Sequence, residues 1–126
     1  MSESALSRTT RLRMFAPAFP VTDLAAALAH YSRLGFATSE YTGEAAAGGY
    51  GFARRDGIEL QLGTVPAGRA ASPTTAYLYV EDADALAAEW GATGADVRPP
   101  QDTPWGQREG VTIDPDGNTI RFGSPL

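Results

Sequence analysis

Aromatic and hydrogen-bonding side chains recur at every second position in four short segments of the chain. They are Tyr50, Phe52, Glu59, Gln61, Tyr77, Tyr79, Thr119 and Arg121. Alternate residues of a strand lie on one face, so this set is expected to share the sheet face opposite the aliphatic residues between them. Aromatic rings with polar groups give a ligand both contact area and direction. The pattern predicts a binding face, and a solvated sheet face is the alternative.

Trp105 is a further candidate for ligand contact. It stands between Pro104 and Gly106, in a loop rather than on a core-facing strand. An exposed tryptophan usually has something to cover it, either a ligand or a partner subunit. Both roles remain open for Trp105.

Residues suited to metal or nucleophilic catalysis are scarce. The chain has no cysteine and one histidine, His30, which falls in a predicted helix and is expected at its solvated edge. The sequence contains no Gly-x-Ser-x-Gly nucleophile turn. Catalysis without a metal would need another acid, base or nucleophile, and nothing near Glu59 or the tyrosines marks them as activated.

Charge and composition narrow the range of partners. The net charge is −5, which disfavours nucleic acid, and the basic residues are scattered apart from Arg8, Arg11 and Arg13 near the N-terminus. No apolar run is long enough to cross a membrane, and no apolar signal segment is found at the start. The absence of cysteine is compatible with a reducing cytoplasm, which is the expected location.

The two halves of the chain resemble each other. An acidic residue before a helix, an aromatic residue within it and a glycine at its end all recur after 59 residues. These pairs are Asp23 and Asp82, Tyr31 and Trp90, and Gly35 and Gly94. Residues 56–63 and 116–123 are similar at an offset of 60. Landmarks that recur in one order indicate a duplication.

Each half is predicted to be a βαβββ module. A strand at about 14–21 or 76–80 leads into a helix that Asp23 or Asp82 can cap and that Gly35 or Gly94 can end. The strands that follow are expected at about 37–41, 50–54 and 58–62, and at about 96–98, 108–113 and 118–122.

The predicted fold class is α+β, with the two modules forming a curled mixed sheet around a cleft and the helices on its outer face. The whole chain, residues 1–126, is expected to be one domain. Its modules lie at about 12–64 and 74–124, joined by a linker at 65–73 that is rich in proline and glycine.

Two segments add a resemblance to a known superfamily. Residues 104–109 read PWGQRE, and residues 113–118 read IDPDGN, followed by Arg121-Phe122. With the paired βαβββ modules, these segments resemble the vicinal oxygen chelate superfamily, which includes glyoxalase I, ring-cleaving dioxygenases and bleomycin-resistance proteins. The similarity is greatest to the bleomycin-resistance group, and it covers about residues 12–124.

The resemblance implies four metal-ligand positions, one in the first and one in the last strand of each module. In this sequence they are occupied by Ala16, Gln61, Thr75 and Arg121. Superfamily enzymes use His and Glu there; alanine and threonine cannot replace an imidazole, glutamine is a weak ligand and arginine is a permanent cation. A one-step slip would bring in Glu59, but one carboxylate does not make a site. Neither a metal nor another cofactor is therefore expected.

By resemblance, bleomycin-resistance proteins are homodimers that exchange N-terminal strands around a proline, and Pro17 stands at that position. An edge-strand residue is the alternative for Pro17. They hold a bulky cationic glycopeptide between aromatic rings, for which the matching residues are Tyr50, Phe52, Tyr77, Tyr79 and Trp105. This sequence departs from the bleomycin-resistance group at Arg121, which places a cation in the cleft unless Glu59 pairs with it. It also departs at residues 43–49, which are nearly neutral where the resistance proteins tend to be acidic.

The leading hypothesis is a protein that binds and sequesters a bleomycin-type antibiotic or a similar bulky aromatic ligand, without catalysis, and so confers resistance. The alternative is a diverged superfamily enzyme, of lyase or dioxygenase type, that acts on a small oxygenated substrate. A non-catalytic ligand sensor or accessory subunit is a third reading.

Overall fold

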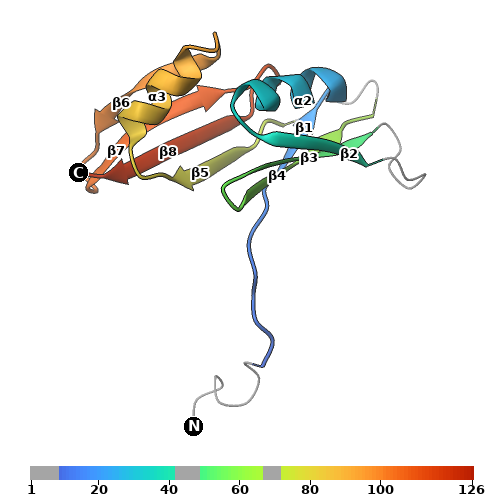
Figure 1. Cartoon of the computed structure of the whole chain (residues 1–126), viewed down its shortest axis with the longest axis horizontal. Helices are drawn as coiled ribbons and strands as arrows, with labels where there is room; N and C mark the ends of the chain where they lie inside the picture. Colours follow the sequence, from blue (N-terminus) through green and yellow to red (C-terminus); the bar gives the residue numbers. More distant parts are fainter. Residues whose placement is uncertain (1–8, 42–48, 67–71) are drawn as a thin grey trace.

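Two βαβββ modules, each with its own four-stranded mixed sheet, make up the chain (Figure 1). The computed structural model describes residues 9–41, 49–66 and 72–126. Module one contains β1 (Ala18–Val21), α2 (Leu24–Arg33), β2 (Ala37–Tyr41), β3 (Tyr50–Arg55) and β4 (Ile58–Thr64). Module two contains β5 (Thr75–Tyr79), α3 (Ala83–Gly91), β6 (Asp96–Asp102), β7 (Gln107–Ile113) and β8 (Thr119–Pro125).

The two sheets repeat one topology. Their strand orders are β1-β4-β3-β2 and β5-β8-β7-β6, and in each the first strand of the module runs parallel to the last. The other neighbours are antiparallel. The predicted α+β class and its two βαβββ modules are confirmed, although the curled sheet is two separate four-stranded sheets that do not close.

The helix boundaries follow the predicted signals. The Asp23 and Asp82 carboxylates each accept a hydrogen bond at 3.0 Å, from the backbone N–H of Ala26 and Ala85 respectively. These caps satisfy N–H groups that have no partner within the helix. Just beyond the two helices, glycines take left-handed conformations, with φ of 89° at Gly35 and 85° at Gly94.

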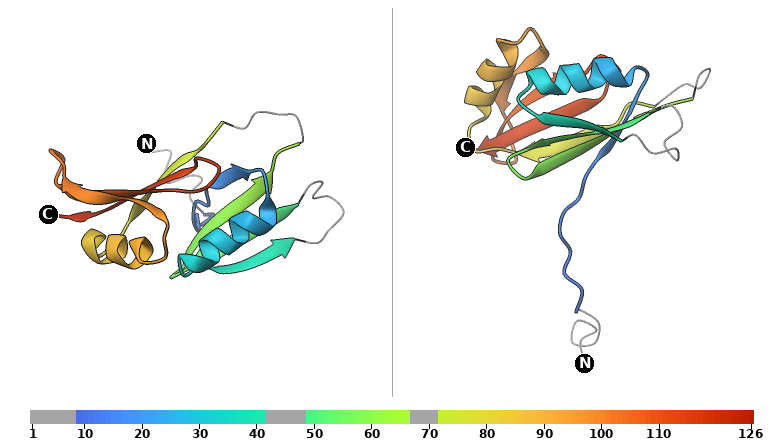
Figure 2. Two further views of the ribbon diagram at one scale, coloured as in Figure 1. Left: turned by 90° about the horizontal axis from the view of Figure 1, so that it is seen from above. Right: turned by 45° about the vertical axis from the view of Figure 1, so that its right-hand side comes forward.

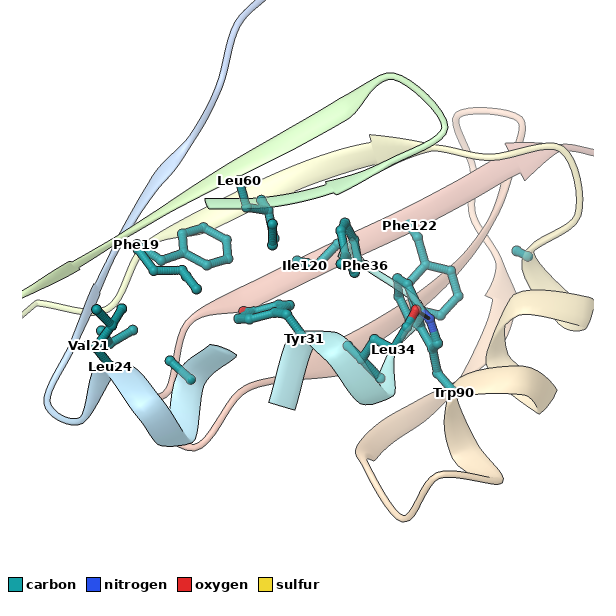
Figure 3. Close-up of a cluster of buried hydrophobic side chains, with 14 residues drawn as sticks. Phe19, Val21, Leu24, Tyr31, Leu34, Phe36, Leu60, Trp90, Ile120 and Phe122 are labelled. Atoms are coloured by element: carbon teal, nitrogen blue, oxygen red, sulfur yellow. Dashed lines mark hydrogen bonds between the residues drawn. The ribbon is translucent and has the colours of Figure 1, made fainter. Parts of the chain in front are cut away.

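The hydrophobic core joins the modules instead of dividing between them (Figure 3). Tyr31 and Leu34 of module one lie close to Trp90 and Phe122 of module two in the same buried cluster. The indole N–H of Trp90 donates to the Leu34 carbonyl at 3.0 Å, so a core side chain of one module also satisfies the helix end of the other. Since a module of this size alone buries little surface, sharing the core stabilises both.

The turn after β7 fastens the modules together by hydrogen bonds. The buried Asp114 carboxylate accepts from the Tyr31 hydroxyl at 2.9 Å and from the Asn118 backbone N–H at 2.8 Å. The Asn118 amide donates to the Pro20 carbonyl at 2.9 Å and accepts from the Thr74 backbone N–H at 3.0 Å. We call these five residues, Pro20, Tyr31, Thr74, Asp114 and Asn118, the joint.

Three expectations about module one are wrong. The first strand begins at Ala18 and not near residue 14. Residues 9–16, the N-terminal arm, run away from the sheets on the side opposite the helices (Figures 1 and 2), whereas the Pro17 carbonyl still accepts from the Gln61 backbone N–H at 2.9 Å. Strand alternation predicts that Ile58 is buried with Leu60 and Leu62, but Ile58 is 41% exposed, because it directly follows the Asp56-Gly57 turn. His30 is 6% exposed and not at a solvated edge.

Burial of His30 has a cause outside its own module. Its ring packs edge-on against Tyr31, with the centroids 4.9 Å apart. Asp96 and Asp114 of module two line a cavity of about 340 Å³ on its other side. Burial lowers the pKa of His30, which nearby Asp114 partly offsets. Module two therefore covers an edge of α2 that would be solvated if module one stood alone.

Parts of two sequence-based expectations lie outside the described residues. These are most of the nearly neutral segment 43–49 and the middle of the linker 65–73. In the part of the chain that is described, no helix is both long and apolar enough to span a membrane.

Candidate functional site

Each sheet has one face without a helix, which we call its open face. Both helices lie on the same side of the two sheets, and the N-terminal arm leaves on the other (Figures 1 and 2). Strand register brings Phe52 beside Gln61 on the first open face and Tyr77 beside Arg121 on the second. The intervening apolar residues, such as Leu60 and Phe122, are buried under the helices, as the alternation predicts.

On the first open face, a hydrogen-bonded chain crosses from β3 to β4. The Tyr50 hydroxyl donates to the Gln61 side-chain oxygen at 2.6 Å, and the Gln61 amide donates to Glu59 at 3.1 Å. Arg54 forms an ion pair with Glu59 at 2.7 Å, and its guanidinium lies 5.1 Å from the centre of the Phe52 ring. Hydrogen bonds from Gln61 and Arg54 hold the pKa of Glu59 below its usual value. The ring positions are therefore fixed by polar contacts.

On the second open face, Glu109 of β7 is the centre of the polar network. Its carboxylate accepts from the Trp105 indole at 2.6 Å and from the Tyr77 hydroxyl at 2.9 Å. Its other oxygen accepts from the Arg121 guanidinium at 2.7 Å, and that guanidinium lies 5.4 Å from the Tyr77 ring centre. Tyr79 packs against Tyr77 with ring centres 4.9 Å apart. One carboxylate thus orients a tryptophan, a tyrosine and an arginine.

The two titratable partners in this network are shifted in opposite directions. Desolvation acts to raise the pKa of Glu109, but the hydrogen bonds from Trp105, Arg121 and Tyr77 outweigh it and lower the pKa. Desolvation and the Glu109 carboxylate raise the pKa of Tyr77 to about 12. Near neutral pH, Glu109 is therefore ionised and Tyr77 keeps its proton.

Glycines leave room for one tyrosine on each open face, Tyr77 and Tyr50. A Cβ atom at Gly123 would overlap the Tyr77 hydroxyl and lie 3.2 Å from Cγ of Glu109. A Cβ atom at Gly63 would lie 3.0 Å from the Tyr50 ring. Both glycines directly follow a core residue of the last strand of their module, so the same device recurs on each open face.

The structure divides the eight predicted ligand residues into two groups of four. The first open face carries Tyr50, Phe52, Glu59 and Gln61, and the second carries Tyr77, Tyr79, Trp105 and Arg121. Among the described residues, no hydrogen bond or ring contact links one group to the other. Each group is a surface, not a closed pocket.

A groove of about 580 Å³ runs between the β3–β4 turn and α3, and Tyr79 is the only one of these eight residues that lines it. Apolar residues such as Leu78 and Leu86 form much of its wall, and Glu81, Asp82 and Glu89 also line it. It lies at the boundary between the modules and meets the second open face at Tyr79, whose ring packs against Tyr77.

The four positions implied for a metal do not gather metal-binding groups. Gln61 has Ala18 as its strand neighbour and Arg121 has Tyr77, whereas Ala16 lies in the N-terminal arm and Thr75 pairs with Thr119. Within the described residues, no three His, Cys, Asp or Glu side chains lie close enough to hold a metal ion. The Arg121 guanidinium would repel a cation at its own position.

Sequence reasoning missed two residues that organise the open faces, Glu109 and Arg54. Both alternate with buried residues in strands that were predicted, so their position on the open face was available from the pattern. Their partners were not, and the pairing of Glu59 with Arg121, which the sequence left open, does not occur. Arg121 pairs with Glu109 and Glu59 with Arg54, because antiparallel register places them on adjacent strands of their own sheets.

Comparison with known proteins agrees with this architecture. A search of curated proteins found no match. Among solved structures, a bleomycin resistance determinant encoded on the transposon Tn5 is similar with a TM-score of 0.74 and 22% identity, over 89% of this chain and 97% of that chain. A bleomycin-binding protein complexed with bleomycin is similar with a TM-score of 0.73 and 22% identity, over 90% and 98%.

The third comparison has a higher sequence identity. TnmS3, an antibiotic binding protein from Streptomyces sp. CB03234, is 28% identical with a TM-score of 0.72, over 94% of this chain and 98% of that chain. The sequence profile of the Glyoxalase/Bleomycin resistance protein/Dioxygenase superfamily matches residues 12–122. With paired βαβββ modules and a profile match over most of its length, the chain belongs to that superfamily.

Proposed function

We propose that this protein binds and sequesters a bulky aromatic antibiotic, of the bleomycin type or with a similar flat aromatic part, without chemical change. The observation that carries the proposal is the pair of open faces, each of which presents aromatic rings held by hydrogen-bonded polar groups. Tyr79 is 78% exposed and Trp105 is 62% exposed. Large aromatic side chains at such exposure supply contact area for a flat ligand.

Binding is favoured over catalysis by the state of the carboxylates. The superfamily includes enzymes, so membership alone does not decide between the two. Glu59 and Glu109 both have lowered pKa values and are fully engaged by hydrogen-bond donors, which makes them weak general bases. Tyr77 has a raised pKa, which disfavours its action as a base.

The ligand site is proposed to form between two copies of the chain, which exchange their N-terminal arms around Pro17. In the arm, Leu12 is 90% exposed and Phe15 is 99% exposed, and such apolar side chains are stabilised when a partner covers them. β1 and β5 are the edge strands of their sheets, where backbone groups can pair with an added strand. A second copy would also enclose open faces that one chain leaves uncovered.

The dimer is tested by light scattering after size exclusion. The full chain is expected to have twice the mass of the 13.3 kDa monomer, and L12S/F15S is expected to shift it to monomer. Leu126→Ser, at a similarly exposed apolar position, is the matched control and is expected to stay dimeric. A monomeric full chain would overturn the arm exchange.

Ligand binding is tested by isothermal titration with copper-loaded bleomycin and with acridone, an uncharged planar tricycle. Saturable binding of either ligand is expected, with a loss of tenfold or more in Trp105→Ala and Tyr79→Ala. Thr38→Ala, an exposed position on the other face of the first sheet and outside the groove, is the control. No saturable heat with either ligand would overturn the proposed function. A cytoplasmic location goes with this role, because sequestration protects an intracellular target.

A further inference from the structure

The charged side chains of the open faces are all neutralised within those faces. Strand register assigns six described charged residues to them: Arg54, Glu59, Asp96, Arg98, Glu109 and Arg121. Three are cations and three are anions, and they form three ion pairs, at 2.7 Å for Arg54–Glu59, 3.1 Å for Arg98–Asp96 and 2.7 Å for Arg121–Glu109. The binding faces therefore carry no net charge, although the chain carries −5.

The excess acid lies elsewhere. Residues 81–91, which include α3, contain four carboxylates and no lysine or arginine. Glu89 forms an ion pair with Arg55, and Asp84 with Arg108, whose side chains face the helices. α3 is on the opposite side of its sheet from Tyr77 and Arg121 (Figure 1), and Glu81, Asp82 and Glu89 line the groove at the module boundary that Tyr79 also lines.

In two of these ion pairs, Arg54–Glu59 and Arg121–Glu109, the arginine side chain is the more exposed partner. The Arg121 side chain is 42% exposed and its partner Glu109 is 9% exposed. The Arg54 side chain is 56% exposed and its partner Glu59 is 12% exposed. A ligand that approaches either of these two pairs therefore meets guanidinium groups and aromatic rings, while Glu59 and Glu109 are covered. In the third pair, Arg98 and Asp96 are both exposed, at 61% and 53%.

The exposed Arg121 guanidinium has N–H groups that can donate hydrogen bonds to a ligand. Within the described residues, the Arg121 guanidinium makes one hydrogen bond, from Nη2 to Glu109, out of its five N–H groups. A planar guanidinium pairs well with carbonyl, carboxylate or phenolate oxygens. The neighbouring rings of Tyr77 and Tyr79 offer the stacking surface beside it.

From these observations we infer that the open faces bind a flat polycyclic aromatic molecule that carries oxygen acceptors and no positive charge, and that they discriminate against polycationic ligands. The inference rests on the proposed function and specifies its ligand class. Beside the aromatic rings a cation would face the exposed Arg54 and Arg121, whose partners Glu59 and Glu109 are covered, whereas a neutral or anionic ligand gains a charge-assisted hydrogen bond at Arg121.

The test compares three tricyclic probes of matched size by isothermal titration: acridone (neutral), anthraquinone-2-carboxylate (anionic) and proflavine (cationic). The neutral and anionic probes are expected to bind at least about tenfold more tightly than proflavine, equivalent to about 1.4 kcal/mol. The affinity for acridone should change less than about twofold between 20 and 500 mM salt, because no net charge is involved.

The Arg121→Gln variant identifies the residue responsible. It is expected to weaken the anionic probe by fivefold or more and to strengthen proflavine, since Glu109 then loses its counter-ion. Arg33→Gln makes the same change of charge on α2, away from the open faces, and should leave both affinities within twofold. Anionic binding that survives Arg121→Gln unchanged would overturn the role of Arg121.

The outcomes separate this inference from the function on which it rests. Tighter binding of proflavine than of the other probes overturns the ligand class but leaves an aromatic-binding protein. Failure of all three probes and of bleomycin overturns both.

Discussion

Gly123→Ala should destabilise the protein only while Tyr77 is present. An added Cβ overlaps the Tyr77 hydroxyl, so the ring must rotate and give up its hydrogen bond to the ionised Glu109. A hydrogen bond to a charged group contributes about 1.5–3 kcal/mol. Gly123 does not have a positive φ, so alanine fits its backbone and stabilises by about 0.4–1 kcal/mol through the unfolded state. The net expected loss is about 1–2 kcal/mol.

In a Tyr77→Ala background the overlap with the hydroxyl is gone, and the remaining close approach, 3.2 Å to Cγ of Glu109, needs only a small shift of a side chain that no longer bonds Tyr77. Gly123→Ala should then stabilise by about 0.4–1 kcal/mol, so the sign of the effect reverses. The measurement is the free energy of unfolding from urea titrations of the four proteins at one fixed protein concentration. Gly91→Ala, where a Cβ meets no atom within 4 Å, should act alike in both backgrounds. Equal effects of Gly123→Ala in both backgrounds, within about 0.3 kcal/mol, would refute the reasoning.

Two further predictions concern the joint and its surroundings. Burial holds the pKa of His30 below its unfolded value of about 6.5, so the unfolded chain takes up the proton first and stability should decline as the pH falls below about 6.5. The urea midpoint should therefore drop more between pH 7.5 and 5.5 in the wild type than in His30→Leu, and parallel profiles would contradict this. Tyr31→Phe removes a hydrogen-bond donor from the buried Asp114 and should lower the free energy of unfolding by about 1–3 kcal/mol. Tyr41→Phe, which removes the hydroxyl of an exposed tyrosine, is the control and should leave the free energy of unfolding almost unchanged. A Tyr31→Phe protein as stable as the wild type would show that Asp114 needs no donor from module one.

Local signals in the sequence were sufficient for the fold. Asp23 and Asp82 cap helices and Gly35 and Gly94 end them, because these effects depend only on residues within a few positions. The offset of 59 to 60 residues correctly anticipated a repeated topology. Strand alternation also assigned the open-face residues correctly, since it follows from backbone geometry alone.

Features that depend on contacts between distant residues were not foreseen. His30 is buried by module two, so no periodicity in its own helix could indicate its environment. The convergence of Trp105, Tyr77 and Arg121 on Glu109 requires three strands and a loop in register. The turn at residues 114–118 connects β7 to β8, and its further role as part of the joint depends on Pro20, almost a hundred residues earlier.

The joint also determines which parts of this protein can change independently. Asn118 ties β1 to the start of β5, and Asp114 holds α2, so a hybrid that combined one module with a relative's other module would have to match all five joint residues at once. No hydrogen bond among the described residues connects the joint to the Tyr50 or Tyr77 networks. Open-face side chains can therefore be exchanged without disturbing the joint, which makes this scaffold suited to acquiring new ligands by substitutions within a face and resistant to doing so by module shuffling.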